Sequence, residues 1–333
     1  MGYWQYLNPW GATQDGSGTR PTHLQDQSPA MLNFVNLPLR FLTHNIRYAT
    51  TGPFAGEELW PVRAPGLINE LRFHTNALDA FIGLQECLNG QLIDIMDGLN
   101  NQTSSSASYS QIESTGSDEW AYLGVGRNDG KEAGEYSPII YRPAIWEVVD
   151  YQYFWLSETP NVPSKGWDAG SIRIVTIGHF RHRESSREFL MLNTHLDNAG
   201  SVSRQKSAEL IITFINNYLS KYGNGTVLPV ILTGDFNSET SGEAYQYLSS
   251  PPSVVRDIRD SVAPSRWYGN ENTFTGFSEA DGPPTRIDFI FAGPVGNTTS
   301  AVAAYKDYAV LANKFDDGVY ISDHRAVVGD VVL

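Results

Sequence analysis

The chain has 333 residues, and its hydrophobic content of 41%, with 12% aromatic residues, is enough for the core of one large layered domain. Its net charge of −14 argues against tight, electrostatically driven binding of nucleic acid, although it does not exclude a site that carries its own metal ion. The single cysteine, Cys87, excludes an internal disulfide, and its place after an apolar run favours a buried structural role over a nucleophilic one. No apolar run reaches the roughly 18 residues that a membrane span needs.

The predicted elements alternate between strands and helices along the chain. Apolar runs of strand length occur at 39–46, 79–86, 119–126, 137–142, 172–180, 187–195, 228–234, 285–293 and 325–333. Helical spacing of apolar residues predicts helices at 61–79, 88–100 and 201–220. This mixture indicates an α/β fold with two mixed β-sheets packed face to face and helices outside. Because no linker divides the chain, we predict an N-terminal extension over residues 1–37 and one domain over residues 38–333.

Two features of the sequence bear on the compartment in which the chain works. The first residues have neither the charged nor the apolar segment of a signal peptide. Three sequons, at Asn101, Asn224 and Asn297, tilt slightly towards a secretory history. We therefore expect a secreted, mature chain that has lost its signal peptide.

Residues of the kinds that bind metals or transfer protons stand at the ends of the predicted strands, and two of them precede the last strand. They are Asn45, Gln85, Glu86, His195, Asp235, Asn237, Asp323 and His324, with Asp288 inside an apolar strand. Asp235 and Asn237 stand two positions apart after the run VILTG, so they can project to one face. Each residue alone has an ordinary alternative, because Gly, Asp and Asn also form turns and a lone histidine is more often structural. A turn does not account for Asp288, because it lies inside an apolar strand and a buried carboxylate needs a partner. His324 is the candidate for that partner.

Three of these residues fit a metal site made of oxygen ligands. Glu86, Asn45 and Asp323 offer the hard oxygens that suit Mg²⁺, with Mn²⁺ as an expected substitute. The ion would neutralise the charge of a phosphate and of the leaving group. No cysteine cluster, and no pair of histidines at helical spacing, indicates a zinc site instead.

The other residues complete a scheme for hydrolysis of a phosphate ester. Asp235 would orient and deprotonate the attacking water, with Asn237 fixing its angle. His195 and His324, kept protonated by carboxylates, would stabilise the pentacovalent oxygens. The residue types alone therefore permit metal-assisted hydrolysis of a phosphate ester.

The order of the motifs resembles that of the endonuclease/exonuclease/phosphatase superfamily. Across residues 38–333 the motifs are LTHNIRY, GLQE, GKEAGEYSPIIYR, NTHLD, LTGDFNSE, TRIDFIF and SDHRAVV. The resemblance implies a deoxyribonuclease I-like four-layer sandwich of two mixed β-sheets flanked by helices, with residues 38–333 as the catalytic domain. It also implies Mg²⁺-dependent hydrolysis of a phosphoester. Further stretches, among them GVGRNDGKEAGEYSPI and NTHLDNAG, resemble an uncharacterised, secreted-type subfamily.

The resemblance implies a role for the metal ligands and for the residues that orient water. Asn45 matches the asparagine of the family's first strand, which contacts metal or substrate, and Glu86 matches its metal-binding glutamate. Asp323 matches the last metal ligand. Asp235 and Asn237 match the pair that orients the attacking water.

The resemblance also implies catalytic roles for two histidines and their carboxylates. His195 matches a histidine of the pancreatic-type deoxyribonucleases, and Glu135 matches the carboxylate that holds that histidine. His324 matches the family's final histidine, and Asp288 matches the aspartate behind it.

Each of three further positions has both a functional and a structural interpretation. Arg173 stands where some members keep an arginine that faces the phosphate, but it could equally form a salt bridge at a strand edge. Arg47 stands where several DNA-repair members have an aspartate that assists the metal, so it could contact phosphate or pair with a carboxylate. Trp167, in the predicted rim loop 157–170, could stack on a substrate or anchor the loop.

The sequence leaves the substrate open between a nucleic-acid diester, a nucleotide and a small or lipid-linked phosphate. The acidic composition favours a small or single-stranded substrate over long duplex. The alternative function is a non-catalytic module that binds a phosphate ligand on the same fold. We expect no stable insertion into a membrane and find no evident protein partner.

Overall fold

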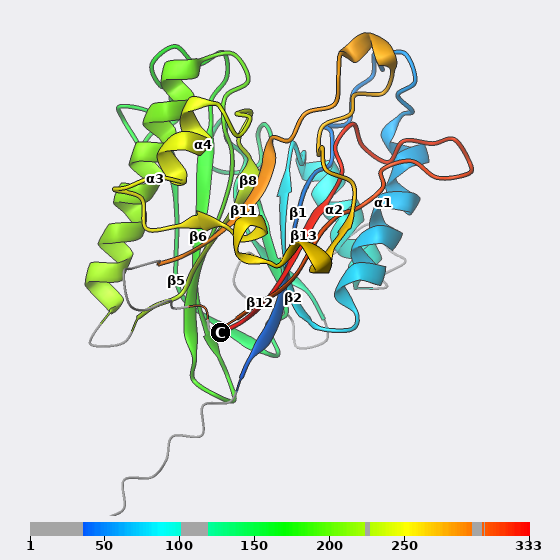
Figure 1. Ribbon diagram of the computed structural model, residues 1–333. Coiled ribbons are helices and arrows are strands. Elements are labelled where there is room, and N and C mark those ends of the chain that lie inside the picture. Colours follow the sequence, from blue (N-terminus) through cyan, green and yellow to red (C-terminus); the bar gives the residue numbers. More distant parts are fainter. Residues whose placement is uncertain (1–35, 101–118, 224–226, 295–301, 303) are drawn as a thin grey trace, which may run out of the picture. The chain divides into compact units, whose positions relative to one another are not determined.

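The computed structural model describes residues 36–100, 119–223, 227–294, 302 and 304–333. Residues Asn36–Leu333 form one compact unit. In the described part of this unit, two mixed β-sheets pack against each other and helices cover their outer faces, as Figure 1 shows. This is the four-layer α/β arrangement expected from the sequence. Among the described residues, no helix has the length and apolar character that crossing a bilayer requires.

Within the described residues, one sheet has seven strands and the other has six. In pairing order, the seven strands are β10 (Trp267–Gly269), β12 (Ala304–Val310), β13 (Val327–Val332), β1 (Pro38–Asn45), β2 (Asp79–Gln85), β4 (Ile139–Tyr141) and β3 (Ala121–Leu123). The six strands are β5 (Trp146–Trp155), β6 (Ile174–His182), β7 (Glu188–His195), β8 (Val230–Asp235), β11 (Asp288–Gly293) and β9 (Arg256–Asp257). Strands β1 and β2 are parallel, as are β7 and β8, whereas β13 and β11 run antiparallel to their neighbours β1 and β8.

Each sheet is covered by its own helices (Figure 1). Helices α1 (Trp60–Thr75) and α2 (Asn89–Leu99) pack on the seven-stranded sheet. Helices α3 (Ser201–Tyr222) and α4 (Glu243–Leu248) pack on the six-stranded sheet. Three short 3₁₀ helices complete the described elements, at η1 (Ile258–Ser261), η2 (Pro264–Arg266) and η3 (Glu279–Asp281).

Alternation of side chains along the strands builds these layers. In β2, Phe81 faces the space between the sheets, whereas Ala80 and Ile82 face the helices. In β7, Phe189 points inward and Leu190 points towards α3 in the same way. The rings of Phe81 and Phe189 meet edge to face, with centroids 4.9 Å apart. The centre of the molecule is therefore an aromatic core between the two sheets.

Towards the carboxyl ends of β1, β2, β7 and β8, the layer between the sheets becomes polar. Gln85 Nε2 donates to Asn193 Oδ1 (2.8 Å) and to Thr43 Oγ1 (3.0 Å). Thr233 Oγ1 donates to the same Asn193 oxygen at 3.0 Å. A glycine at position 83 permits this close approach, because a Cβ there would lie 2.6 Å from Thr233 Oγ1. A hydrogen-bonded polar layer thus lies between the aromatic core and the strand ends.

The predicted elements mostly occur, but some boundaries were wrong. The helix expected at 61–79 ends at Thr75, because Asp79 already begins β2. The strand expected at 119–126 is reduced to the three residues of β3. Strands β5 and β12 were missed, because they interleave apolar with charged residues and are only partly buried. Such strands at or near a sheet edge lack the continuous apolar run that marks a buried strand.

Several predictions concern residues outside the described part of the chain. The three sequons lie there, as does the proposed N-terminal extension up to residue 35. The extension, its boundary and secretion therefore stay predictions.

Cys87 is fully buried, and burial raises the pKa of its thiol, which agrees with a structural role.

Candidate active site

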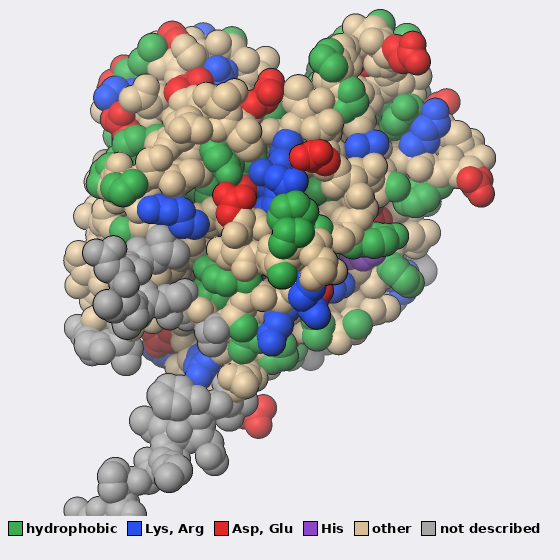
Figure 2. Space-filling model, in the orientation of Figure 1, with side chains coloured by type: hydrophobic (Ala, Val, Ile, Leu, Met, Phe, Trp, Pro, Cys, Tyr) green, Lys and Arg blue, Asp and Glu red, His purple; other side chains and the backbone are tan. Residues whose placement is uncertain are grey.

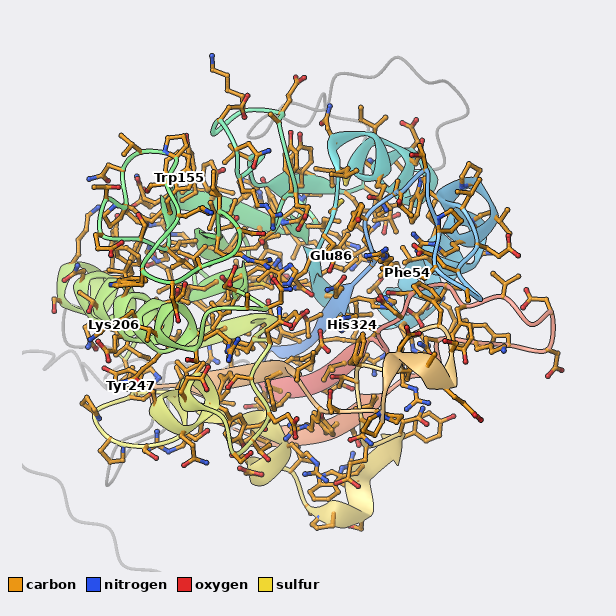
Figure 3. All side chains as sticks on the ribbon, turned by 90° about the horizontal axis from the view of Figure 1, so that it is seen from above. Phe54, Glu86, Trp155, Lys206, Tyr247 and His324 are labelled. Atoms are coloured by element: carbon orange, nitrogen blue, oxygen red, sulfur yellow. The ribbon has the colours of Figure 1, made fainter. Side chains whose placement is uncertain are left out.

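Strand direction gathers polar residues at one edge of the two sheets. His195 and Asp235 end the parallel strands β7 and β8 and are paired in register. Asp288 begins the antiparallel strand β11 and is paired with Asp235 from the other side. In the view from above, Figure 3 shows Glu86 and His324 close to each other where the strands of both sheets end. Residues from distant parts of the chain therefore meet at one place.

Asp235 lies at the centre of this arrangement. Its Oδ1 accepts a hydrogen bond from a backbone N–H two residues on (2.9 Å), and its Oδ2 accepts one from Asn45 Nδ2 (2.9 Å). The Nε2 atoms of His195 and His324 lie 3.5 and 3.7 Å from the same Oδ2. Burial and the neighbouring Asp288 raise the pKa of Asp235 to about 7, although His324 opposes this. A carboxyl with this pKa can accept a proton near neutral pH.

His324 forms a buried ion pair with Asp288. Its Nδ1 lies 2.9 Å from Asp288 Oδ2, and the ring of Phe274 packs edge-on against it. Burial alone would lower the pKa of His324, but Asp288 and Asp235 raise it to about 10. The ring is therefore a cation at neutral pH, as the sequence led us to expect.

His195 differs from that expectation. Burial, and then the charges of Arg173 and Arg127, hold its pKa well below the usual value, so the ring is neutral. The amide nitrogen of Asn237 lies 3.0 Å from Nε2 and donates to it, which puts the ring proton on Nδ1. Glu135 lies 3.8 Å from that Nδ1, but it accepts two hydrogen bonds of 2.6 and 2.7 Å from Arg127. Glu135 thus pairs chiefly with Arg127 and reaches His195 only at ion-pair distance.

An oxygen-rich edge formed by Asn45, Glu86 and Asp323 adjoins these residues. Asn45 Nδ2 donates to Glu86 Oε1 (3.1 Å) as well as to Asp235, so one amide joins both carboxylates. Burial raises the pKa of Asp323 to about 6, with His324 opposing this and Glu86 adding to it. A buried carboxylate beside a second carboxylate is a donor set that a divalent cation stabilises.

The backbone turns sharply at three of these strand ends. Arg47, Glu86 and Asn237 all adopt left-handed conformations, with φ of 57°, 57° and 47°. They follow the ends of β1, β2 and β8 by one or two residues. A left-handed residue other than glycine costs on the order of 1 kcal/mol, and such residues concentrate at functional sites. The strained turns aim side chains away from the sheets and into the space above them.

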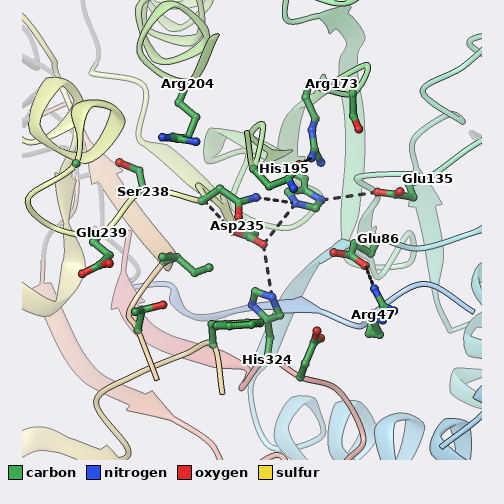
Figure 4. A pocket seen from close by; sticks show the side chains of 18 of the residues that line it. Arg47, Glu86, Glu135, Arg173, His195, Arg204, Asp235, Ser238, Glu239 and His324 are labelled. Carbon is green, nitrogen blue, oxygen red and sulfur yellow. Dashed lines mark hydrogen bonds and ion pairs between the residues drawn. The ribbon is translucent and has the colours of Figure 1, made fainter. Parts of the chain in front are cut away.

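These groups line a cavity of about 700 Å³, drawn in Figure 4. It opens at the notch between the two lobes at the top of Figure 2. Arg173, which directly precedes β6, points into the cavity. Its Nε lies 3.3 Å from Asp197 Oδ2, and its Nη2 donates to Asn198 Oδ1 at 3.0 Å. Its Nη1 is buried and has no hydrogen-bond partner among the described residues. A buried guanidinium nitrogen without a partner is available to an anionic ligand.

Comparison with known families identifies the group to which this site belongs. The model of the endonuclease/exonuclease/phosphatase family matches residues 42–324, which is most of the chain. The chain belongs to this family. Membership indicates a phosphoric ester hydrolase, and members of the endonuclease/exonuclease/phosphatase family typically depend on a metal ion.

Solved structures of family members extend over almost the whole chain. A family protein from Bacteroides thetaiotaomicron is 32% identical, with a TM-score of 0.73, and the match covers 90% of this chain and 96% of that chain. A mannosyl-6-phosphatase of the same organism is 32% identical, with a TM-score of 0.71, and the match covers 89% of this chain and 100% of that chain.

An uncharacterized protein of Acanthamoeba polyphaga mimivirus is 26% identical over 184 residues. That match spans 52% of this chain and only 62% of the viral protein.

Two groups of residues in this site could hold a metal ion. Asp235, Asp288 and His324 offer ligand atoms that all lie within 4.8 Å of one another. However, Nδ1 of His324 already binds Asp288, and a protonated ring has no free lone pair for a metal. The edge that carries Glu86 and Asp323 has carboxylate oxygens, which fit a hard divalent cation better.

The cavity brings together most of the residues predicted from the sequence. Those that line it are Glu86, Glu135, Arg173, His195, Asp235, Asn237, Asp323 and His324. Asn45 and Asp288 lie behind the lining, hydrogen-bonded to Asp235 and His324. Trp167 is not part of the lining, and its backbone N–H donates to Glu158 at 3.2 Å, which favours the loop-anchor alternative.

Sequence reasoning missed three residues that shape the cavity. Arg127 holds Glu135, and Arg204 pairs with Glu243 on the opposite wall. Asp197, two residues after His195, accepts hydrogen bonds from four backbone N–H groups, of residues 170, 171, 199 and 200. The stretches GVGRNDGKEAGEY and NTHLDNAG contain two of the three, but only the folded chain shows their partners.

We expect Asp197→Asn to destabilise the fold in a pH-dependent way. Burial alone would raise the pKa of Asp197, but the four backbone N–H groups lower it to about 2. A depressed pKa contributes stability above the unfolded value near 4, and this contribution is lost as pH falls towards the folded value. The variant should therefore lose about 2 kcal/mol of unfolding free energy at pH 7, and less at pH 3.

Urea denaturation of both proteins at pH 7 and pH 3 measures this difference. Asp316→Asn serves as the control, because Asp316 is exposed. A deficit for Asp197→Asn that is equally large at both pH values would contradict the role of the charge.

Proposed function

We propose that the chain is a metal-dependent phosphoesterase in which Asp235 activates the attacking water. The observation that carries this proposal is the position of Asp235, buried at the floor of the cavity and held by Asn45 and a backbone N–H. Its pKa of about 7 makes it an effective proton acceptor at neutral pH. Both of its oxygens are fixed, so a water that it binds is also oriented.

The neighbouring residues provide the charges that a phosphate ester requires. His324 is a fixed cation 3.7 Å from Asp235 and would stabilise the negative charge that develops on the phosphoryl oxygens. Arg173 would bind a phosphate oxygen through its free Nη1. The neutral His195 would position Asn237 and the water rather than supply charge.

We propose that Glu86 and Asp323 hold Mg²⁺ or Mn²⁺, while Asn45, whose amide nitrogen donates to Glu86 and Asp235, orients both carboxylates. When bound there, the ion supplies a Lewis acid that neutralises charge on the phosphate and on the leaving group. Support comes from the oxygen donors and from the raised pKa of Asp323, which burial and Glu86 both favour.

Glu86→Gln is expected to raise the Mg²⁺ concentration for half-maximal activity by about 10-fold or more, because an amide binds a hard cation more weakly than a carboxylate does. Titration of activity with Mg²⁺ at saturating substrate measures this shift. Glu158→Gln, outside the cavity, is the matched control. An identical titration for Glu86→Gln and wild type would remove Glu86 from the ligand set.

The charges of the cavity favour a small phosphomonoester over a nucleic-acid strand. The wall beyond Asp235 carries Glu239 and Glu243, and the arginine beside them, Arg204, is already paired with Glu243. A neighbouring phosphate of a strand would meet these carboxylates, whereas hydroxyl groups of a sugar could donate to them. The face in Figure 2 likewise has acidic and basic side chains interspersed, without a broad basic track. The mannosyl-6-phosphatase at 32% identity supports the same choice.

A hydrolysis screen with Mg²⁺ or Mn²⁺ tests the proposal. Substrates should include sugar phosphates, nucleotides, single-stranded DNA and RNA, and phospholipid headgroups. Release of phosphate from sugar phosphates is the expected result. Shortened oligonucleotides without free phosphate would instead identify a nuclease, and binding without turnover of any substrate would favour the non-catalytic alternative. Secretion is a separate proposal that rests on the sequons alone.

A further inference from the structure

Arg63 of helix α1 is a buried arginine whose hydrogen bonds, within the described residues, all go to backbone carbonyl groups. It is 1% exposed, forms no salt bridge among the described residues, and lies 5.5 Å from the ring centroid of Trp60. Nε donates to the carbonyl of Glu58 (2.9 Å), and Nη1 donates to those of Ile46 (2.9 Å) and Ile321 (2.8 Å). Nη2 donates to the carbonyl of Arg47 at 3.0 Å. One guanidinium therefore joins four backbone positions.

Such an arrangement is unusual, because burying a charge without an ion pair is unfavourable. Burial lowers the pKa of Arg63, while the charge of Glu57 opposes this. The planar guanidinium has five N–H donors in a fixed fork, so it can bind several carbonyls at once, which an ammonium group cannot do in the same geometry. The side chain is thus suited to holding separate backbone segments at fixed positions.

The segments that it holds carry two residues of the proposed metal site, the ligand Asp323 and Asn45, which donates to Glu86. Ile46 and Arg47 directly follow Asn45, and Ile321 stands two residues before Asp323. Arg47 has the left-handed φ of 57°, and its carbonyl is also bound by Gln91 Nε2 at 3.1 Å. These bonds stabilise a strained turn in the one conformation that the edge of the cavity requires.

A second contact joins the same two segments. Ser322 Oγ donates to the carbonyl of Asn45 at 2.6 Å and accepts from the backbone N–H of His324 at 3.1 Å. The turn after β1 and the turn before β13 are therefore linked twice, once through the guanidinium of Arg63 and once through the hydroxyl of Ser322. Neither link involves a side chain that lines the cavity.

We propose that Arg63 is a positioning residue, which sets the spacing between Asn45 and Asp323 by binding the backbone of both turns. The inference rests on the proposed function, in which Asp323 holds the metal with Glu86 and Asn45 orients Glu86 by a hydrogen bond. Residues behind the ligands of a metal site commonly change affinity or activity by ~10- to 100-fold when they are altered.

The test compares Arg63→Lys with wild type and with Arg40→Lys. Arg40 is also on a partly buried contact between strands, where it binds Asp330 and the carbonyl of His74, but it lies at the opposite end of β1. Calorimetric titration with Mn²⁺ alone, without substrate, gives the metal affinity of each full-length chain. Thermal unfolding without metal gives their stability, and kcat and KM are measured at saturating Mg²⁺.

Arg63→Lys is expected to bind Mn²⁺ ~10- to 100-fold more weakly than wild type. Its kcat should fall by a larger factor than its KM changes. Arg40→Lys should lower the unfolding temperature without a change in Mn²⁺ affinity. If Arg63→Lys loses stability but binds Mn²⁺ as wild type does, its role is purely structural and the proposal is overturned.

A second variant covers the case in which Arg63→Lys does not fold. Ser322→Ala removes the other link between the two turns with little change in volume, and it should weaken Mn²⁺ binding in the same direction. Unchanged Mn²⁺ binding by Ser322→Ala would then reject the idea that the link between the turns sets the site. Absence of Mn²⁺ binding by the wild type would instead contradict the proposed function itself.

Discussion

Asp235→Asn is expected to lower kcat by about 10³- to 10⁴-fold, the upper range for loss of a positioned general base. The amide is nearly the same size as the carboxyl, but it cannot accept a proton from water. Asn45 Nδ2 and the backbone N–H of Asn237 both donate to the carboxylate of Asp235, so the variant also loses part of this hydrogen bonding. Steady-state hydrolysis of an activated phosphodiester and of a sugar phosphate measures the loss.

Asp79→Asn is the matched control for this variant. Asp79 is a half-buried aspartate whose pKa burial likewise raises, but it accepts from Trp146 Nε1 at the start of β2, at the opposite end of the strands. Its variant should retain turnover. Mn²⁺ binding by Asp235→Asn should stay close to wild type, and unchanged turnover by this variant would remove Asp235 from the mechanism.

His324→Gln is expected to lower kcat by about 10²- to 10⁴-fold, because the cavity loses a fixed positive charge beside the phosphoryl group. The change also leaves Asp288 buried without its partner at 2.9 Å. Breaking a buried pair in this way costs roughly 3–5 kcal/mol of stability, so the rates must be measured well below the unfolding temperature.

His179→Gln separates the two effects. His179 is likewise buried and lies 2.9 Å from a carboxylate, Glu188, but it stands on β6 outside the cavity. It should lose stability and keep its kcat. If both histidine variants lost activity only in proportion to the unfolded fraction, His324 would have no catalytic role.

Asp288→Asn tests the charge of His324 without removing the ring. Asp288 is the largest influence that raises the pKa of His324, against the lowering effect of burial. Without it, that pKa falls and the ring loses its proton at a lower pH. The pH profile of kcat/KM should therefore decline at lower pH in the variant than in wild type, whose His324 has a pKa of about 10.

Hydrophobic patterning carried the prediction of the fold. Strand β2 was predicted from its continuous apolar run, and it is buried on both faces, with Phe81 towards the other sheet and Ala80 and Ile82 towards the helices. Strand β5 was missed because an edge strand has weaker burial, and WEVVDYQYFW therefore mixes charged with apolar residues. Local patterns thus predict well where burial is complete and fail where it is partial.

Many residue types of the site could also be predicted, because they stand at the ends of predicted strands. Asp235, with Asn237 two positions on, and His324, with a buried aspartate as its partner, needed only the strands and the chemistry of buried carboxylates. The protonation of His195 could not be predicted in this way. Its low pKa arises from burial and from Arg173 and Arg127, whose distances from the ring no spacing in the chain reveals.

By itself, the amino-acid sequence determined the layered α/β fold, the family and the set of polar residues at the strand ends. Only the tertiary structure decided that Glu135 pairs with Arg127, that Trp167 stays outside the cavity and that Arg63 binds two distant turns. The physical reason is that patterns of burial repeat along one strand or helix and can be read locally. Charge and hydrogen bonding depend on distances of a few ångströms between segments far apart in the chain, and these distances exist only after folding.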